Sequence, residues 1–192
     1  HKPKTTRPAT PAGPSARPPT PSPNSYDCAV LLGSAERAGG TPLSVSGVVV
    51  ADAGGKGGVF LLHAILSILG IPCHIVFDGD CGGGDRLRAK NQDVNAQAED
   101  NKNQSLNRSL LRYLGEPEVD WPVTAVHEGY SVIADKMETL LDAEWPECAS
   151  DTLGLGKPEK NARLYRHAAR NAATDPPPFV KELLEQARNM AQ

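Results

Sequence analysis

Hydrophobic residues recur with two different periods in the middle of the chain. The β-branched run from Val45 to Asp52 predicts a buried strand that ends at an acid. After a glycine-rich turn, apolar residues recur at helical spacing from Val59 to Leu69, and Gly70 is a suitable stop. A second apolar run, Cys73 to Phe77, predicts another strand. The order strand, helix, strand predicts a βαβ unit and therefore a parallel sheet.

The rest of the chain predicts mainly helices. Residues 85–103 are polar without a clear period, and we expect a mobile loop beside the site. Leucines on one face predict a helix over Gln104–Leu114, and Val123–Val126 predicts a third strand. Further helices are expected near 135–141 and over 158–172 and 178–190. The predicted fold class is α/β, a parallel sheet flanked by helices, with additional C-terminal helices.

The N-terminal segment has a different composition. Residues 1–24 contain eight prolines and no large apolar side chain, which is typical of a disordered or polyproline-like linker. Residues 25–44 contain a short apolar patch but no clear element. We therefore expect a tail or linker over residues 1–44 and one folded domain over residues 45–192.

Composition narrows the class of protein. A formal net charge of −3 does not indicate a general nucleic-acid coat, although an acidic metal site can coexist with a basic groove. The four cysteines are scattered, which favours reduced thiols in a cytoplasmic protein over disulfides or structural zinc. No apolar run approaches the roughly 20 residues that span a membrane. No signal peptide is evident, and the start at His1 fits a fragment of a longer protein.

Three acids follow the predicted strands. Asp78 and Asp80 are two residues apart, so on an extended strand end both carboxylates point to one side. Asp52 ends the other predicted strand, and the carboxyl ends of parallel strands meet at one edge of a sheet. Carboxylate oxygens suit Mg²⁺ or Mn²⁺. The alternative is a polar turn after a buried strand.

Two other site types match the sequence less well. The turn Gly54-Gly55-Lys56-Gly57-Gly58 lacks the Ser or Thr that a phosphate-binding P-loop needs, because Gly57 occupies that position. Lys56 could instead face a phosphate of a nucleic-acid substrate, or it could be a solvated loop lysine. The Asp-x-Asp pair also resembles haloacid-dehalogenase-like phosphatases, but there the pair normally belongs to the first strand.

The ordered set of strand, acid, helix and Asp-x-Asp strand end resembles the Toprim domain of topoisomerases, primases and a group of nucleases. In more detail, it is similar to the C-terminal nuclease region of the overcoming-lysogenization-defect (OLD) family of ATP-dependent endonucleases. The resemblance is carried by VVVADAGGKGGVFLLHAILSILGIPCHIVFDGD, NQSLNRSLLRYLG, ADKMETLL and the Gly156-Lys157-Pro158 helix start. It spans residues 45–190.

The resemblance implies roles for particular residues. Asp78 and Asp80 match the metal-binding pair, and Asp52 stands where the family usually has Glu. Glu138 resembles an acid of a later helix that contributes to a second metal, and Asp135 lies near it in sequence. Lys157 matches a basic residue that stabilises charge on the scissile phosphate. Glu138 as a solvated acid and Lys157 as a loop lysine are the alternatives.

The activity implied is Mg²⁺- or Mn²⁺-dependent hydrolysis of DNA, in which one ion activates a water and a second stabilises the leaving oxygen. Lys157 or Lys56 would add positive charge where the transition state gains negative charge. The family resemblance further implies an N-terminal ATPase domain, absent from this chain, and a possible homodimer. Because Lys56 stands where the family often has a second acid, a Toprim domain that has lost catalysis and serves DNA binding or assembly is the alternative.

Overall fold

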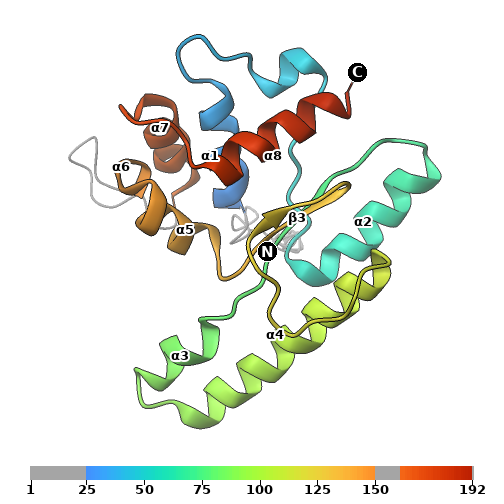
Figure 1. The fold of residues 1–192 in the computed structure, drawn as a ribbon, viewed down its shortest axis with the longest axis vertical. Coiled ribbons are helices and arrows are strands. Elements are labelled where there is room, and N and C mark those ends of the chain that lie inside the picture. The colour runs from blue at the N-terminus through green and yellow to red at the C-terminus, as the bar shows by residue number, and fades with distance from the viewer. Residues whose placement is uncertain (1–24, 150–160, 192) are drawn as a thin grey trace, which may run out of the picture.

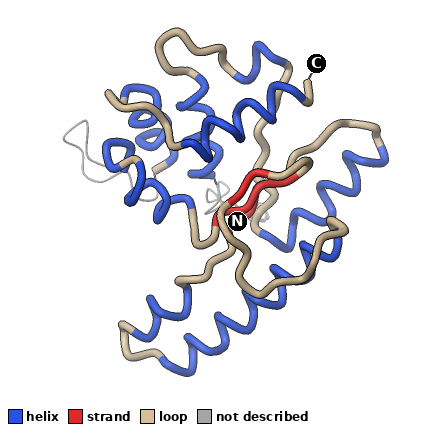
Figure 2. The backbone as a smooth tube through the Cα atoms, in the orientation of Figure 1, coloured by secondary structure: helices blue, strands red, loops and turns tan. Residues whose placement is uncertain are grey.

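The structure, a computed structural model, describes residues 25–149 and 161–191 of the 192-residue chain. At its centre is a three-stranded sheet with the strand order β1-β3-β2 (Figures 1 and 2). β1 (Ile75–Asp78) and β3 (Tyr130–Ile133) are parallel, and β2 (Ala125–Val126) runs antiparallel to β3. The predicted α/β class, with a parallel pair flanked by helices and further C-terminal helices, is confirmed.

Two helices, α2 (Lys56–Ile68) and α4 (Asp93–Tyr113), pack on one face of the sheet. Side chains alternate along a strand, so Ile75 and Phe77 of β1 point to this face and are buried. They join a core that also includes Val59 of α2 and Leu110 of α4. The short helix α3 (Gly83–Arg88) packs against α4, away from the sheet (Figure 1).

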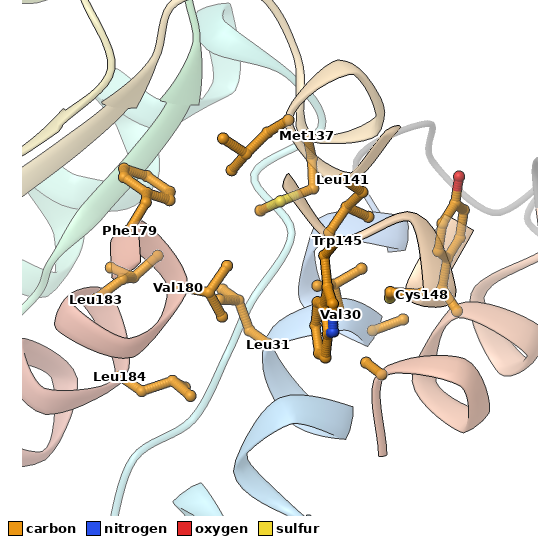
Figure 3. Packing of buried hydrophobic residues seen from close by; sticks show 14 of the residues in the cluster. Val30, Leu31, Met137, Leu141, Trp145, Cys148, Phe179, Val180, Leu183 and Leu184 are labelled. Carbon is orange, nitrogen blue, oxygen red and sulfur yellow. The ribbon is translucent and has the colours of Figure 1, made fainter. Parts of the chain in front are cut away.

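Helices from both ends of the described chain form the layer on the opposite side (Figure 1). Their buried side chains form the larger core, in which Trp145, Val30 and Val180 are at most 1% exposed (Figure 3). Ile133 and Val76 of the sheet also contact this core. The helices are α1 (Ser25–Ala35), α5 (Met137–Glu144), α6 (Pro146–Ala149), α7 (Ala162–Asn171) and α8 (Pro178–Asn189).

The structure moves the predicted domain boundary towards the N-terminus. Residues 25–35 form α1, whose Ala29, Val30 and Leu31 are buried in the larger core, so this segment belongs to the folded domain. The apolar patch was too short to predict a helix, and its burial depends on α7 and α8, which lie far along the chain. Residues 1–24, predicted as a linker, lie outside the described residues.

The strand predicted over Val45–Asp52, and with it the βαβ unit, is wrong. A short 3₁₀ helix, η1 (Leu43–Ser46), occupies its start, and residues 48–53 belong to no described strand. β1 takes β3 as its parallel partner instead. A β-branched run becomes a strand only where another strand lies beside it to complete the hydrogen bonds. Strand β3 has no counterpart among the sequence predictions, because four consecutive buried residues show no alternation.

The loop predicted over residues 85–103 is also wrong, because α3 and the first half of α4 occupy it. The buried face of α4 carries polar residues, Asp100, Asn103 and Asn107, at positions where leucines are usual. The hydrophobic pattern therefore does not show the helical period. The predicted helices over 104–114 and 178–190 are confirmed, as is the helix that ends before Gly70. None of the described helices is long and apolar enough to cross a membrane. None of the four cysteines forms a disulfide in the structure.

Candidate active site

The loops that follow β1 and β3 lie side by side. Because the two strands are parallel, their carboxyl ends meet at one edge of the sheet. The N–H of Gly79 donates to the carbonyl of Ile133 (2.6 Å), and that of Asp80 donates to the carbonyl of Asp135 (2.8 Å). A Cβ on residue 79 would collide with the carbonyl oxygen of Ala134, so this close approach requires glycine. The backbone therefore fixes the Asp78-Gly79-Asp80 turn against β3.

Asp80 has an unusual backbone conformation. Its φ is +57°, in the left-handed region that few residues other than glycine and asparagine or aspartate adopt. This conformation turns the chain sharply after Gly79 and lets the Asp80 side chain reach α2. Non-glycine residues with positive φ are concentrated at functional sites, which is consistent with a binding role for this turn.

Asp27 and Asp78 carry the most strongly perturbed carboxyls of this region. Burial raises the pKa of Asp27 to about 7, with further contributions from the charges of Glu138, Asp52 and Asp80. Burial likewise raises the pKa of Asp78 well above its usual range, and Asp27, Asp80 and Glu138 raise it further. Neither carboxylate has a hydrogen-bond or ion-pair partner among the described residues. The structure thus gathers five acids that repel one another.

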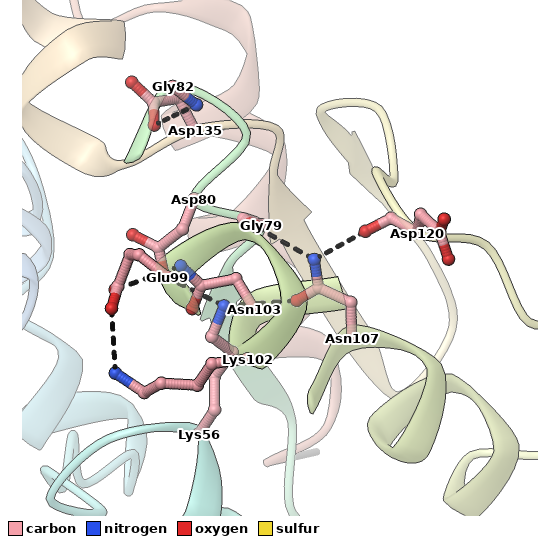
Figure 4. Close-up of polar contacts among 10 residues, drawn as sticks. All are labelled: Lys56, Gly79, Asp80, Gly82, Glu99, Lys102, Asn103, Asn107, Asp120 and Asp135. Carbon is pink, nitrogen blue, oxygen red and sulfur yellow. Dashed lines mark hydrogen bonds and ion pairs between the residues drawn. The ribbon is translucent and has the colours of Figure 1, made fainter. Parts of the chain in front are cut away.

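Lys56 supplies positive charge to this group. It is the first residue of α2, and its Nζ lies 2.8 Å from an Asp80 carboxylate oxygen. The same Nζ donates to the side-chain oxygen of Asn107 at 3.1 Å (Figure 4). Its side chain is 10% exposed, so the ion pair is largely shielded from water. The charge of Lys56 lowers the pKa of Asp78, although burial dominates there.

Asn107 connects the turn, the lysine and α4. It is fully buried, and its amide donates to the carbonyls of Gly79 and Asp120, both at 2.9 Å (Figure 4). Its side-chain oxygen accepts the hydrogen bond from Lys56. Both polar atoms of the Asn107 side chain are hydrogen-bonded inside the protein. Asn107 therefore fixes Lys56 relative to the Asp-Gly-Asp turn.

The other predicted metal residues lie around Asp27. Asp52 is exposed in the segment before α2, where its carboxylate accepts the N–H of Gly54 at 2.7 Å. Glu138 is in the first turn of α5, with the Nζ of Lys136 4.0 Å away. The structure thus brings Asp52, Asp78, Asp80 and Glu138 into one neighbourhood. Lys157 lies outside the described residues.

Asp135 is held by partners of its own. Its carboxylate accepts hydrogen bonds from Arg86 (2.5 Å), Thr139 (2.7 Å) and the N–H of Gly82 (3.1 Å). Burial alone would raise the pKa of Asp135, but these hydrogen bonds lower it below its usual value. Asp135 therefore anchors the loop after β1 to the start of α5, and we assign it a positioning role.

The carboxylates of this region are of the ligand type that a hard divalent cation prefers. The two unpartnered carboxyls with raised pKa values, Asp27 in α1 and Asp78 at the end of β1, are groups whose charge Mg²⁺ or Mn²⁺ would neutralise. The side chains of the described residues do not by themselves form a ready-made cluster of three or more metal ligands.

Two residues of this site were missed by the sequence analysis. Asp27 precedes the segment that carried the motif, and only the packing of α1 brings it to Asp78. The sequence did contain a signal for α1, because an acid such as Asp27 is common in the first turn of a helix. Asn107 lies within the matched stretch NQSLNRSLLRYLG, on the same helical face as Leu110 and Leu111, where an asparagine is unusual.

Residues 26–80 match the family model described as overcoming lysogenization defect protein-like, TOPRIM domain. This match confirms the resemblance drawn from the sequence, and it includes Asp27 as well as Asp78 and Asp80. It supports a Toprim module of the nuclease and DNA-processing kind. Neither a curated protein nor a solved structure matches the chain.

Proposed function

We propose that this chain is a metal-dependent DNA endonuclease module of the OLD-like type, using Mg²⁺ or Mn²⁺. The observation that carries the proposal is the pair Asp27 and Asp78, two carboxyls without partners whose pKa values are raised by burial and by neighbouring acids. Strongly perturbed titratable groups cluster at functional sites. The match of residues 26–80 to the Toprim model is the second line of support.

In this proposal the acids hold the cation and the lysines act on the phosphate. Asp52, Asp78, Asp80 and Glu138, joined by Asp27, would hold the metal, with water completing its coordination. The bound ion would supply an activated water and stabilise charge on the phosphate. Lys56, shielded from solvent beside Asp80, would orient that carboxylate and contribute positive charge. Lys157 is included as a charge-stabilising residue on the family resemblance alone.

The substrate and partners follow from the family resemblance. We propose DNA as the substrate, an ATPase domain as a partner, and a homodimer as the assembly. Most basic side chains of α3 and α4 already form ion pairs with acids, for example Arg86 with Asp135 and Arg88 with Asp100. Affinity for DNA would therefore depend on the metal and on partner domains more than on a basic surface of this module.

A catalytically degenerate binding or assembly module is the second candidate. The observation that favours it is the 2.8 Å ion pair of Lys56 with Asp80, because a lysine there already neutralises one ligand. Mg²⁺ titration by calorimetry separates the two candidates. An endonuclease binds the ion with an affinity that Asp78→Asn lowers, whereas a degenerate module shows no binding heat with either protein.

The proposal is tested by nicking of supercoiled plasmid in Mg²⁺ or Mn²⁺. Cleavage by the full chain should disappear in Asp78→Ala/Asp80→Ala and with excess chelator. Asp175→Ala, an exposed acid in a surface ion pair with Lys181, is the matched control and should cleave normally. Circular dichroism checks that each variant is folded. If folded wild-type protein does not cleave with either metal, or if the double variant cleaves equally well, the endonuclease proposal fails.

A further inference from the structure

A large apolar cavity adjoins the acidic site. It has a volume of about 520 Å³ and lies between β1, residues 47–53, α2 and α8. It is partly open to solvent, and a space of this size is large enough to take a ligand or a peptide segment. Apolar side chains dominate its walls, among them Leu31, Val50, Leu62, Leu66, Val76 and Leu184.

The edge of β1 that borders the cavity has no strand beside it. The N–H of Ile75 donates to Gly129 and that of Gly79 to Ile133, so odd-numbered residues of β1 point their N–H groups towards β3. Alternation along the strand then directs the N–H groups of Val76 and Asp78 to the opposite side, towards the cavity. In the described part of the chain, β1 is an edge strand of the sheet.

The opposite wall carries a second row of free backbone groups. Among the described residues, the backbone of 49–53 makes no hydrogen bond to another backbone group. Val48 and Val50 are half-buried while Val49 is 87% exposed, the alternation of a strand. Each wall ends at an acid, Asp52 or Asp78, whose charge interacts with that of Asp27.

One wall of the cavity also carries a buried polar atom without a partner. The Nε2 of His74 lies 2.7 Å from the hydroxyl of Ser131, but its Nδ1 has no hydrogen-bond partner among the described residues. Burial lowers the pKa of His74 to about 4, so the ring is neutral at pH 7 and can accept or donate one further hydrogen bond. An unsatisfied buried group of this kind is rare in a complete structure.

The geometry points to a strand-acceptor slot: an extended apolar segment of another polypeptide inserts between β1 and residues 48–53 and completes the sheet. Free backbone groups on both sides of the cavity favour a β-strand over a helix or a small molecule. Only a strand can form backbone hydrogen bonds with both edges. A strand of five or six residues matches the length of these walls. Its end would lie against Asp27 and Asp78.

The chain's own N-terminal segment is a poor occupant. Residues 1–24 directly precede α1, which lines the cavity, and are long enough to reach it. Their longest stretch without proline is four residues, Lys4 to Arg7, and none of the 24 side chains is large and apolar. Proline cannot donate to a ladder, and charged or small side chains would not fill an apolar cavity. We therefore exclude residues 1–24 and commit to a separate polypeptide as the occupant.

A designed strand peptide tests this inference. The probe is a blocked peptide of alternating valine and threonine with a lysine at each end, added to the full chain. Hydrogen exchange followed by mass spectrometry should show slowed exchange, by about tenfold or more, confined to segments covering residues 48–53 and 75–78. The melting temperature should rise with peptide concentration. A peptide with proline at its centre is the control and should do neither.

Two variants on adjacent residues of α2 localise the effect. Leu62 lines the cavity, whereas Leu61 is 69% exposed and lies outside its lining. Leu62→Glu should abolish peptide protection, and Leu61→Glu should leave it unchanged. Protection elsewhere in the chain, equal loss in both variants, or no protection by millimolar peptide would overturn the inference. Because none of these readouts uses DNA cleavage, the outcome is independent of the proposed endonuclease activity.

Discussion

The carboxylates of this protein fall into two groups that differ in how they are neutralised. On the side of α3 and α4, Asp100 pairs with Arg88, Asp120 with Arg108, and Asp135 with Arg86. Across the turn after β1, Asp27 and Asp78 have no such partner and interact chiefly with other acids. The two groups are neighbours in the fold, since Asp80 and Asp135 belong to hydrogen-bonded loops.

This difference separates structural acids from candidate functional ones. An acid paired with arginine is already satisfied, and its pKa falls or stays low, as that of Asp135 does. Half-buried acids that repel one another destabilise the folded state at neutral pH, so their presence needs another explanation. Binding of a divalent cation is that explanation in the proposed function.

The largest expected effect is on cleavage. Asp78→Asn removes a proposed metal ligand, and we expect plasmid nicking in Mg²⁺ to fall by about 10²- to 10³-fold or more. The matched change in the paired group, Asp135→Asn, should reduce stability while retaining measurable cleavage. Nicking rates and thermal melts of both variants provide the measurement. Equal loss of cleavage in the two variants would show that the unpartnered and the arginine-paired carboxylates do not differ in function.

The next expected effect is loss of stability on breaking the buried network of Asn107. Asn107→Ala removes the donor to the carbonyls of Gly79 and Asp120 and leaves the Lys56 ammonium with Asp80 as its remaining partner. Unsatisfied buried groups cost about 1–3 kcal/mol each, so we expect unfolding free energy to fall by about 2–3 kcal/mol. Urea unfolding measures it. The control is Asn103→Ala, because Asn103 bonds one partly buried acid, Glu99, and should cost less.

The pH dependence of stability should have opposite signs for the unpartnered carboxylates and for those paired with arginine. Because the pKa of Asp27 is raised from 3.8 to about 7, the folded state keeps a proton that the unfolded state has lost. Stability of the metal-free chain should therefore fall as the pH rises from 6.5 to 8.5, by about 1 kcal/mol. This range avoids the titration of His74, whose folded pKa is about 4.

Thermal melts of wild type and Asp27→Asn at the two pH values provide the test. The variant cannot titrate at this position and should show a smaller decrease. Mg²⁺ should restore the wild-type melting temperature at pH 8.5 and have little effect on the variant. Asp135 has the opposite sign, because its lowered pKa stabilises the fold until the pH falls to acidic values. Identical pH profiles for wild type and Asp27→Asn would contradict the assignment of Asp27.

The smallest effect is expected at the exposed pair of Arg108 and Asp120. Their side chains are 41% and 46% exposed, and such pairs contribute about 0–1 kcal/mol. Asp120→Asn keeps the backbone carbonyl that Asn107 binds, so we expect a change in unfolding free energy below about 1 kcal/mol and unchanged metal binding. Urea unfolding and Mg²⁺ titration check both parts. A large loss would show that the paired group contributes to the site.

The sequence predicted an element correctly where the apolar residues of the segment are also the ones that are buried in the fold. α2 and α8 carry apolar residues at helical spacing, and both were predicted within a few residues. The first half of α4 buries Asp100 and Asn103, whose hydrogen bonds to Gly84 and Glu99 cannot be read from a hydrophobic pattern. β3 and α1 were not predicted because their burial depends on segments far away in the chain.

By itself the sequence determined the α/β class, the turn at Asp78-Gly79-Asp80 and the Toprim resemblance, because these follow from local patterns. Tertiary packing decided which acids meet. It brought Asp27 of α1 to Asp78, gave Asp135 an arginine, and left residues 48–53 without the strand partner that their β-branched side chains suit. The physical reason is that a charge or a strand edge takes its properties from its neighbours, and those neighbours come from remote parts of the chain.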